Sequence, residues 1–138
     1  MKKLIILLLF YLLFTTNAAW SHSVSDKASA FIITPNDGAR LTSPFRVTFG
    51  IKHFKIAPAG ENIHKAGHFH LLIDLDTPIS LDDPIPYTQH HRHFDKGETE
   101  VLLSLPPGQH SLQLVVGDEE HEPFEQLISE KIIIEVLK

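Results

Sequence analysis

The stretch His68-Phe69-His70-Leu71-Leu72-Ile73-Asp74-Leu75 (HFHLLIDL, residues 68–75) places an apolar side chain at every second position. Successive side chains of a β-strand point to opposite faces of the sheet. Phe69, Leu71, Ile73 and Leu75 would therefore share one face, and His68 would lie on the other. This alternation predicts a strand with one face buried in a core.

The same period of two recurs along the chain, and no segment shows the 3.6-residue apolar period of an amphipathic helix. It is present in residues 31–33, 45–51, 101–105, 112–116 and 132–136. Turn residues separate these segments at Pro35-Asn36-Asp37-Gly38, Ala57-Pro58-Ala59-Gly60 and Pro106-Pro107-Gly108, and the three prolines of residues 77–88 predict an irregular surface loop. Six or seven short strands at this spacing predict an all-β protein, an antiparallel immunoglobulin-like β-sandwich.

The N-terminus predicts a secretory signal peptide over residues 1–21. Lys2 and Lys3 precede an apolar run over residues 4–14, which is shorter than the about 20 residues that span a bilayer. Small residues favour cleavage between Ser21 and His22, with Ala18/Ala19 as the alternative. Residues 22–138 then form a single β-sandwich domain, expected in the bacterial periplasm or secreted. Because the chain has no cysteine, neither a lipid anchor on that residue nor a disulfide is expected.

The charge of the chain limits its partners. The formal charge is −5, and removal of the two signal lysines takes it to −7. An acidic domain repels nucleic-acid backbones, so nucleic acid is not expected as a partner. A metal ion or an envelope protein is expected instead, without a stable membrane anchor after signal removal.

The ten histidines carry the strongest chemical signal. His68 and His70 would form one same-face pair, and His91 with His93 a second. Imidazole nitrogen suits copper, zinc and nickel. The predicted metal-binding residues are thus His68, His70, His91 and His93, joined by His121 of the acidic segment. The first pair faces away from Phe69, which predicts a site on the surface or at the mouth of the sandwich.

The other histidines give weaker signals. His110 would share a face with Leu112 and Leu114 directly after a turn, and we predict a structural hydrogen bond there. His53 and His64 border a loop. His22 could bind an ion with its own amine only if cleavage occurs before it.

Several segments together resemble the bacterial secreted domain-of-unknown-function 4399 family. They are Gly67-His68-Phe69-His70-Leu71-Leu72-Ile73-Asp74, Pro84-Ile85-Pro86, His93-Phe94, Leu105-Pro106-Pro107-Gly108-Gln109-His110 and Ser129-Glu130-Lys131-Ile132, within residues 28–137. The resemblance implies a secreted bacterial domain and no established activity. The chain departs from the family pattern at Phe69, at Asp95-Lys96, and at Glu119-Glu120 with Phe124.

Three functions stay open from the sequence. The first is a periplasmic histidine-based metal-binding module. The second is a non-catalytic envelope interaction or structural domain. The third is a cupin-like metalloenzyme, because His68-Phe69-His70 and Pro106-Pro107-Gly108 are similar to cupin segments. A fainter likeness, to small periplasmic copper carriers, rests on His22, Pro35-Asn36-Asp37-Gly38-Ala39 and Pro107-Gly108. No serine-hydrolase motif, phosphate loop or cysteine nucleophile is present, so no catalytic residue is predicted and binding is favoured over catalysis.

Overall fold

The computed structural model describes residues 24–61, 63 and 66–138. The predicted signal peptide, its two candidate cleavage sites, His22 and His64 lie outside the described residues. These described residues contain no helix, and so none that could cross a membrane. The prediction of an all-β, antiparallel protein is confirmed, whereas the immunoglobulin-like connectivity stays a prediction.

Ten strands are described, more than the six or seven expected. The additional strands are short or polar, and so lack a long apolar alternation. The strands are β1 (Ser29–Thr34), β2 (Arg40–Thr42), β3 (Phe45–Lys52), β4 (Lys55–Ile56), β5 (Ala66–Ile73), β6 (His91–His93), β7 (Glu100–Leu103), β8 (Gly108–Gly117), β9 (Pro123–Ile128) and β10 (Ile132–Leu137).

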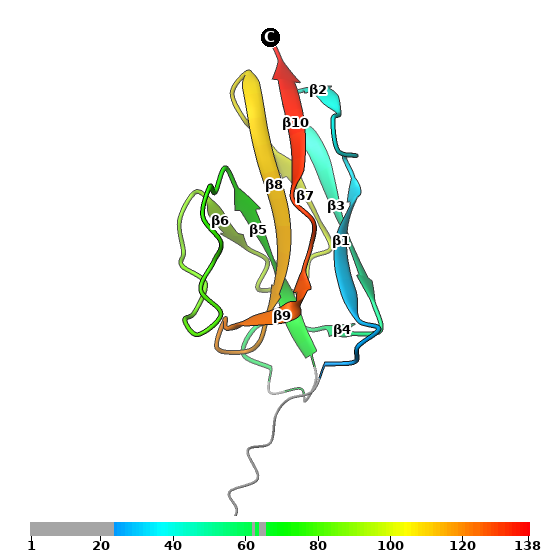
Figure 1. Cartoon of the computed structure of the whole chain (residues 1–138), viewed down its shortest axis with the longest axis vertical. Coiled ribbons are helices and arrows are strands. Elements are labelled where there is room, and N and C mark those ends of the chain that lie inside the picture. Colours follow the sequence, from blue (N-terminus) through cyan, green and yellow to red (C-terminus); the bar gives the residue numbers. More distant parts are fainter. Residues whose placement is uncertain (1–23, 62, 64–65) are drawn as a thin grey trace, which may run out of the picture.

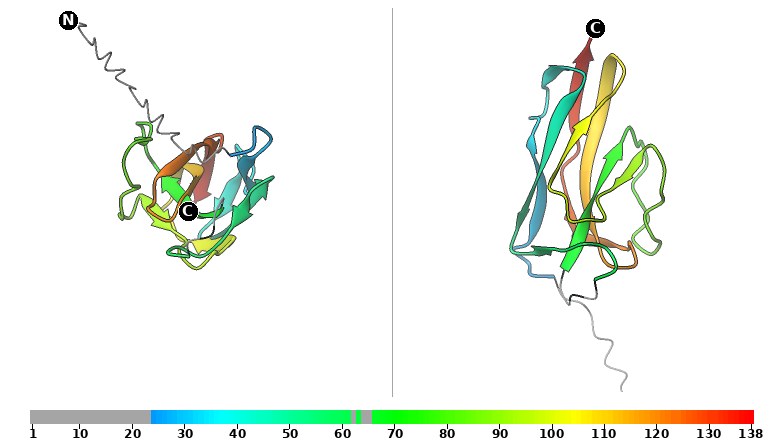
Figure 2. Two further views of the ribbon diagram at one scale, coloured as in Figure 1. Left: turned by 90° about the horizontal axis from the view of Figure 1, so that it is seen from below. Right: turned by 180° about the vertical axis from the view of Figure 1, so that it is seen from behind.

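The strands form two sheets (Figure 1). One has the order β1-β3-β7. The other has the order β2-β10-β8-β5-β4, with β6 paired to β5 and β9 paired to β8. The pairings are antiparallel except for β2 with β10 and β4 with β5, which are parallel. Figure 2 shows the two sheets lying against each other in both further views.

One apolar core joins the two sheets. Phe49 of β3 lies with its ring centroid 5.2 Å from that of Phe69 on β5 and 4.8 Å from that of Phe94. Leu71 on β5 and Leu114 on β8 are fully buried in the same cluster. These are apolar positions of the alternating segments, so the face predicted to be buried is the one that packs against the opposite sheet.

The opposite face of β5 is also covered, which the alternation did not predict. The segment between β5 and β6 is irregular, as expected, but it runs back over this face (Figure 2). Ile85 of that segment is 4% exposed and forms a second, smaller apolar cluster with Leu72 and Val115. Packing of Ile85 therefore brings the proline-containing segment onto the sheet, and β5 is buried on both faces.

Candidate metal centre

Strands β5 and β6 bring the histidine segments together. His70 of β5 pairs directly with His93 of β6 in an antiparallel register. His68 lies two residues before His70, on the same face of β5. The ring centroid of His70 is 4.6 Å from that of His68 and 4.3 Å from that of His93. The two segments converge because their strands are neighbours in one sheet.

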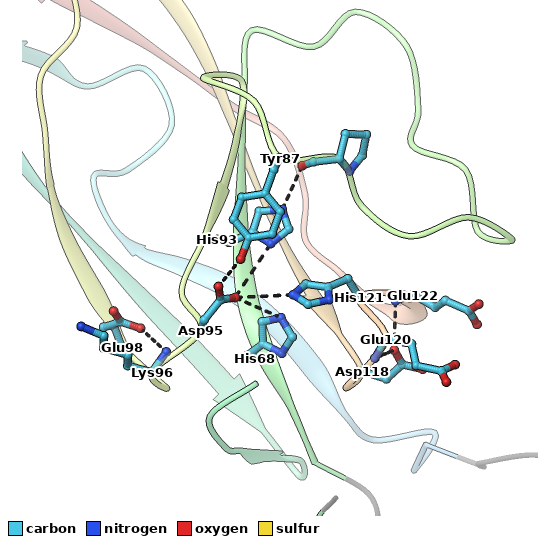
Figure 3. Close-up of polar contacts among 11 residues, drawn as sticks. His68, Tyr87, His93, Asp95, Lys96, Glu98, Asp118, Glu120, His121 and Glu122 are labelled. Carbon is cyan, nitrogen blue, oxygen red and sulfur yellow. Dashed lines mark hydrogen bonds and ion pairs between the residues drawn. The ribbon is translucent and has the colours of Figure 1, made fainter. Parts of the chain in front are cut away.

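Four side chains point their ligand atoms at one another (Figure 3). They belong to His68, His93, Asp95 and His121, and their ligand atoms all lie within 4.8 Å of one another. Asp95 lies at the centre of the group. Its Oδ1 atom is 3.7 Å from Nε2 of His68, 3.9 Å from Nδ1 of His93 and 3.5 Å from Nε2 of His121. We call these four residues the His3Asp group.

The four ligand atoms of the His3Asp group have no hydrogen-bond partner although they are buried. The distances from Asp95 Oδ1 exceed the about 2.7–3.2 Å of an N–H···O hydrogen bond. Buried polar atoms are normally paired, and each exception calls for an explanation such as an ion. The group has the pattern expected of donors arranged around a common cation.

The spacing of the donors fits an ion of transition-metal size. Ligand atoms about 2.0–2.1 Å from a tetrahedral zinc ion are about 3.4 Å from one another. The distances from Asp95 Oδ1, 3.5–3.9 Å, are slightly longer than that edge. The four ligand atoms lie within 4.8 Å of one another, so the group is wider than a filled site, and ion binding would draw the donors inward.

A backbone hydrogen bond selects the tautomer of the neutral His93 ring. Its Nε2–H donates to the carbonyl oxygen of Pro86 at 2.9 Å, because a carbonyl oxygen can only accept. In the neutral ring Nδ1 then carries a lone pair, and this atom faces Asp95. Metal-binding histidines characteristically donate their second nitrogen to a carbonyl or carboxylate in this way.

Tyr87 orients the carboxylate of Asp95. The Tyr87 hydroxyl donates a hydrogen bond to Oδ2 of Asp95, and this leaves Oδ1 directed at the three imidazoles. The phenol ring also stacks on the ring of His93, with centroids 3.4 Å apart and an interplanar angle of 25°. Burial and the hydrogen bond to Asp95 raise the pKa of Tyr87 to about 12, so the hydroxyl keeps its proton at neutral pH.

A turn between β8 and β9 supplies His121. The Oδ1 atom of Asp118 accepts the backbone N–H groups of Glu120 and Glu122, at 2.8 and 2.9 Å. His121 itself has a φ of 67°, in the left-handed region that few residues other than glycine adopt. Residues in such conformations cluster at functional sites, where the surrounding structure holds them. The Asp118 turn provides that support and directs the His121 ring at the group.

Burial keeps the rings of His68 and His93 neutral. It is the largest cause that lowers the pKa of His68 to about 4, and the nearby His121 adds to this effect. It is likewise the largest cause that lowers the pKa of His93. For Asp95, burial raises the pKa, but the hydrogen bond from Tyr87 and the neighbouring histidines outweigh it, so the pKa is lowered. At neutral pH the site holds the Asp95 carboxylate together with the neutral rings of His68 and His93, the protonation states that bind metals.

Comparison with known proteins gives one match. The family described as domain of unknown function (DUF4399) matches residues 47–137, well over half of the chain. The chain belongs to the DUF4399 family. No curated protein and no solved structure matches it. The matched residues include the whole His3Asp group of this DUF4399 domain.

His70 lies behind the His3Asp group and is not part of it. It is fully buried, and neither of its ring nitrogens has a hydrogen-bond partner. Burial, with repulsion from His93 and His68, lowers its pKa to about 2. A methyl group at Gly117 would come within 2.8 Å of its Nε2 atom, so the ring depends on this glycine for space.

His91 is not brought into the group. It pairs across the sheet with Leu72, and its Nδ1 atom is 2.8 Å from the hydroxyl oxygen of Thr88. Its pKa is lowered mainly by burial. His91 and His93 lie on the same face of β6, as expected. Because His93 pairs with His70 and His91 pairs with Leu72, His91 lies one strand repeat farther from His68.

The surface or mouth location predicted for the His68/His70 pair is wrong. His68 is 1% exposed and His70 is fully buried. The physical reason is the packing of Ile85, which brings the connecting segment over this face of β5. The site reaches solvent at Asp95, whose side chain is 43% exposed, and at His121, whose side chain is 25% exposed.

His110 lies near the start of β8, away from the His3Asp group, and makes the hydrogen bonds of a structural residue. Its Nδ1–H donates to Oδ2 of Asp74 and its Nε2–H to the carbonyl oxygen of Pro106, both at 2.8 Å. Burial alone would lower its pKa, but these two bonds outweigh burial and raise it. His110 thus joins the turn before β8 to the end of β5.

Sequence reasoning missed Asp95 and Tyr87 as parts of the site. Asp95 follows His93 by two residues, so the period-two pattern that paired the histidines also pointed to it. In the sequence, Asp95 stands out only as a departure from the family pattern. Tyr87 lies in the proline-containing segment, and no pattern in the sequence indicated its contact with Asp95.

Proposed function

We propose that this DUF4399 domain is a metal-binding module that holds one divalent transition-metal ion in the His3Asp group. The observation that carries the proposal is the position of Asp95 Oδ1, 3.5–3.9 Å from three imidazole nitrogens that have no other partner. Without an ion, these four atoms have no hydrogen-bond partner, and for the almost fully buried His68 and His93 this costs about 1–3 kcal/mol for each group. An ion compensates all four at once.

The donor set supports zinc, copper or nickel as the ion. Imidazole nitrogen is a good ligand for these metals, whereas magnesium and calcium prefer oxygen donors. The Asp95 carboxylate lies beside the neutral rings of His68 and His93, and its negative charge attracts a divalent cation. The chain has no cysteine, so oxidation of thiols cannot damage the site. This suits the oxidising periplasmic or extracellular location that we propose from the N-terminal signal.

The number of protein donors supports binding over catalysis. Structural zinc sites usually have four protein ligands, whereas catalytic sites usually have three and keep a fourth position open for water or substrate. The His3Asp group offers four. We therefore place the metal-binding module ahead of the cupin-like metalloenzyme and of the purely structural envelope domain.

Metal analysis of residues 22–138 tests the proposal. The protein is treated with chelator, incubated separately with zinc, copper(II) and nickel, passed over a desalting column and analysed by atomic emission. About one retained ion per chain is expected, and Asp95→Asn should reduce this amount. Asp82→Asn is the control, because Asp82 is exposed in the segment between β5 and β6. Absence of retained metal with all three ions would overturn the proposal.

A further inference from the structure

Two contacts join the segment 85–87 to the ligands of the His3Asp group. We call this segment the strap. The backbone N–H of Ile85 donates to the carbonyl oxygen of His121 at 2.9 Å. The carbonyl oxygen of Pro86 accepts from Nε2–H of His93 at 2.9 Å. The strap thus contacts one ligand from β6 and another from the turn between β8 and β9.

The third residue of the strap, Tyr87, contacts a third ligand of the group, Asp95. The Tyr87 hydroxyl donates to Asp95 Oδ2, and the Tyr87 ring stacks on His93. Three consecutive residues therefore contact three different members of the group. Figure 3 shows Tyr87 over His93 and the hydroxyl directed at Asp95.

The strap is anchored at one end and accessible at the other. Ile85 is 4% exposed and packs against Leu72 and Val115. Tyr87 is 65% exposed despite its two contacts. This exposure is large for an aromatic residue, so hydrophobic burial of the ring does little to hold Tyr87 in its position. Its contacts with Asp95 and His93 hold it there.

We propose that the strap is the outer coordination shell of the site and controls how tightly the ion is held and how fast it leaves. This inference rests on the proposed metal-binding function. The hydrogen bond to Pro86 orients the His93 ring, the bond from Tyr87 orients the Asp95 carboxylate, and the Ile85 bond holds the backbone of His121. Outer-shell partners of this kind typically contribute about 10–100-fold to metal affinity.

Exchange of the ion requires access to the ligands, and the strap lies where that access is restricted. Tyr87 covers one side of the His93 ring and blocks solvent from it. His68 and His93 have side chains that are 1% exposed, so the ion leaves on the side of Asp95 and His121. Displacement of Tyr87 would release Asp95 and uncover His93 together, which couples strap opening to ion release.

Two substitutions at Tyr87 separate its two contacts. Tyr87→Phe removes the hydroxyl and keeps the stacked ring, whereas Tyr87→Leu removes both. The matched control is Leu81→Ala, because Leu81 is 41% exposed in the same connecting segment and makes none of the three strap contacts. Cobalt(II) serves as a spectroscopic probe, since its visible absorption reports coordination geometry. Zinc affinity and the rate of zinc loss to excess chelator are measured alongside.

The variants are expected to differ in zinc affinity and in the rate of zinc loss, and these differences distinguish the role of the strap from that of the ligands. Tyr87→Phe should lower zinc affinity by about 10–100-fold and shift the cobalt absorption, and Tyr87→Leu should also speed zinc loss. Leu81→Ala should match wild type, and the metal-free Tyr87 variants should unfold like wild type because the side chain is exposed. Wild-type affinity, spectrum and zinc release in both Tyr87 variants would overturn the strap inference and leave the site intact. Failure of the wild type to bind either ion would instead overturn the proposed function.

Discussion

His93 donates its Nε2 proton to the carbonyl oxygen of Pro86 at 2.9 Å, and its Nδ1 atom faces Asp95. A neutral histidine has one N–H and one lone pair, so the bond to Pro86 assigns the lone pair to the side of the cluster. The ring is thereby prepared to bind an ion without any change of tautomer. His93 is therefore the ligand whose substitution we consider first.

His93→Ala should greatly reduce zinc affinity, whereas His91→Ala should not. Both residues lie on β6, but only His93 belongs to the His3Asp group, while His91 contacts Thr88. Loss of a ligand should cost more than the about 10–100-fold typical of outer-shell partners. Calorimetric titration of both variants with zinc compares them directly. Equal losses would mean that the two histidines act as the pair suggested by their spacing.

His68→Leu should stabilise the metal-free domain and abolish zinc binding. His68 is 1% exposed, and its Nε2 atom has no hydrogen-bond partner. An apolar side chain of similar size removes that unpaired group, with an expected gain of about 1–3 kcal/mol in the free energy of unfolding. Denaturant unfolding in the presence of chelator measures the gain. A less stable metal-free variant would show that the imidazole has a structural partner.

Gly117→Ala should lower the free energy of unfolding of the domain. The added methyl carbon would lie 2.8 Å from Nε2 of His70, and His70 is fully buried with the rings of His68 and His93 as neighbours. Overpacking of this kind costs about 1–3 kcal/mol in the free energy of unfolding. Thermal unfolding measures it, with Gly38→Ala as a control, since a methyl group there meets no atom within 4 Å. The positive φ of Gly38 gives that control a backbone cost of its own. An effect at Gly117 no larger than the one at Gly38 would contradict the close approach.

The His110 hydrogen bonds predict a pH dependence of stability. Burial lowers the pKa of His110, but the bonds to Asp74 and Pro106 outweigh it, so the folded pKa is raised above 6.5. The protonated ring therefore contributes stability that is fully present below about pH 6.5 and is lost as pH rises through the folded pKa. His110→Ala should cost about 1–3 kcal/mol at pH 6 and less at higher pH. Urea unfolding at several pH values measures this, and a cost that grows with pH would contradict the assignment.

Much of the fold could be predicted from the alternation of apolar residues. The long strands β3, β5, β8 and β10 carry it, and their inward side chains form the observed core. The short strands could not be found in this way, because β2, β4 and β6 have two or three residues each. Their positions are determined by pairing with neighbours, which is a property of the assembled sheet.

The candidate site was only partly predictable for a similar reason. The spacing of His68, His70 and His93 indicated same-face histidines, and β-sheet register then brought them together. The position of His121 depends on a turn with a left-handed backbone. The burial of His68 and His70 depends on Ile85, whose packing against Leu72 joins positions that the period-two pattern does not relate.

A crystal structure of the zinc-soaked domain, with anomalous data collected at the zinc absorption edge, tests the central claim most directly. The account predicts one strong anomalous peak about 2.0–2.2 Å from Nε2 of His68, Nδ1 of His93, Nε2 of His121 and a carboxylate oxygen of Asp95. It also predicts that Tyr87 keeps its contact with Asp95. A peak at other histidines with the His3Asp group empty, or no peak at all, would contradict the account.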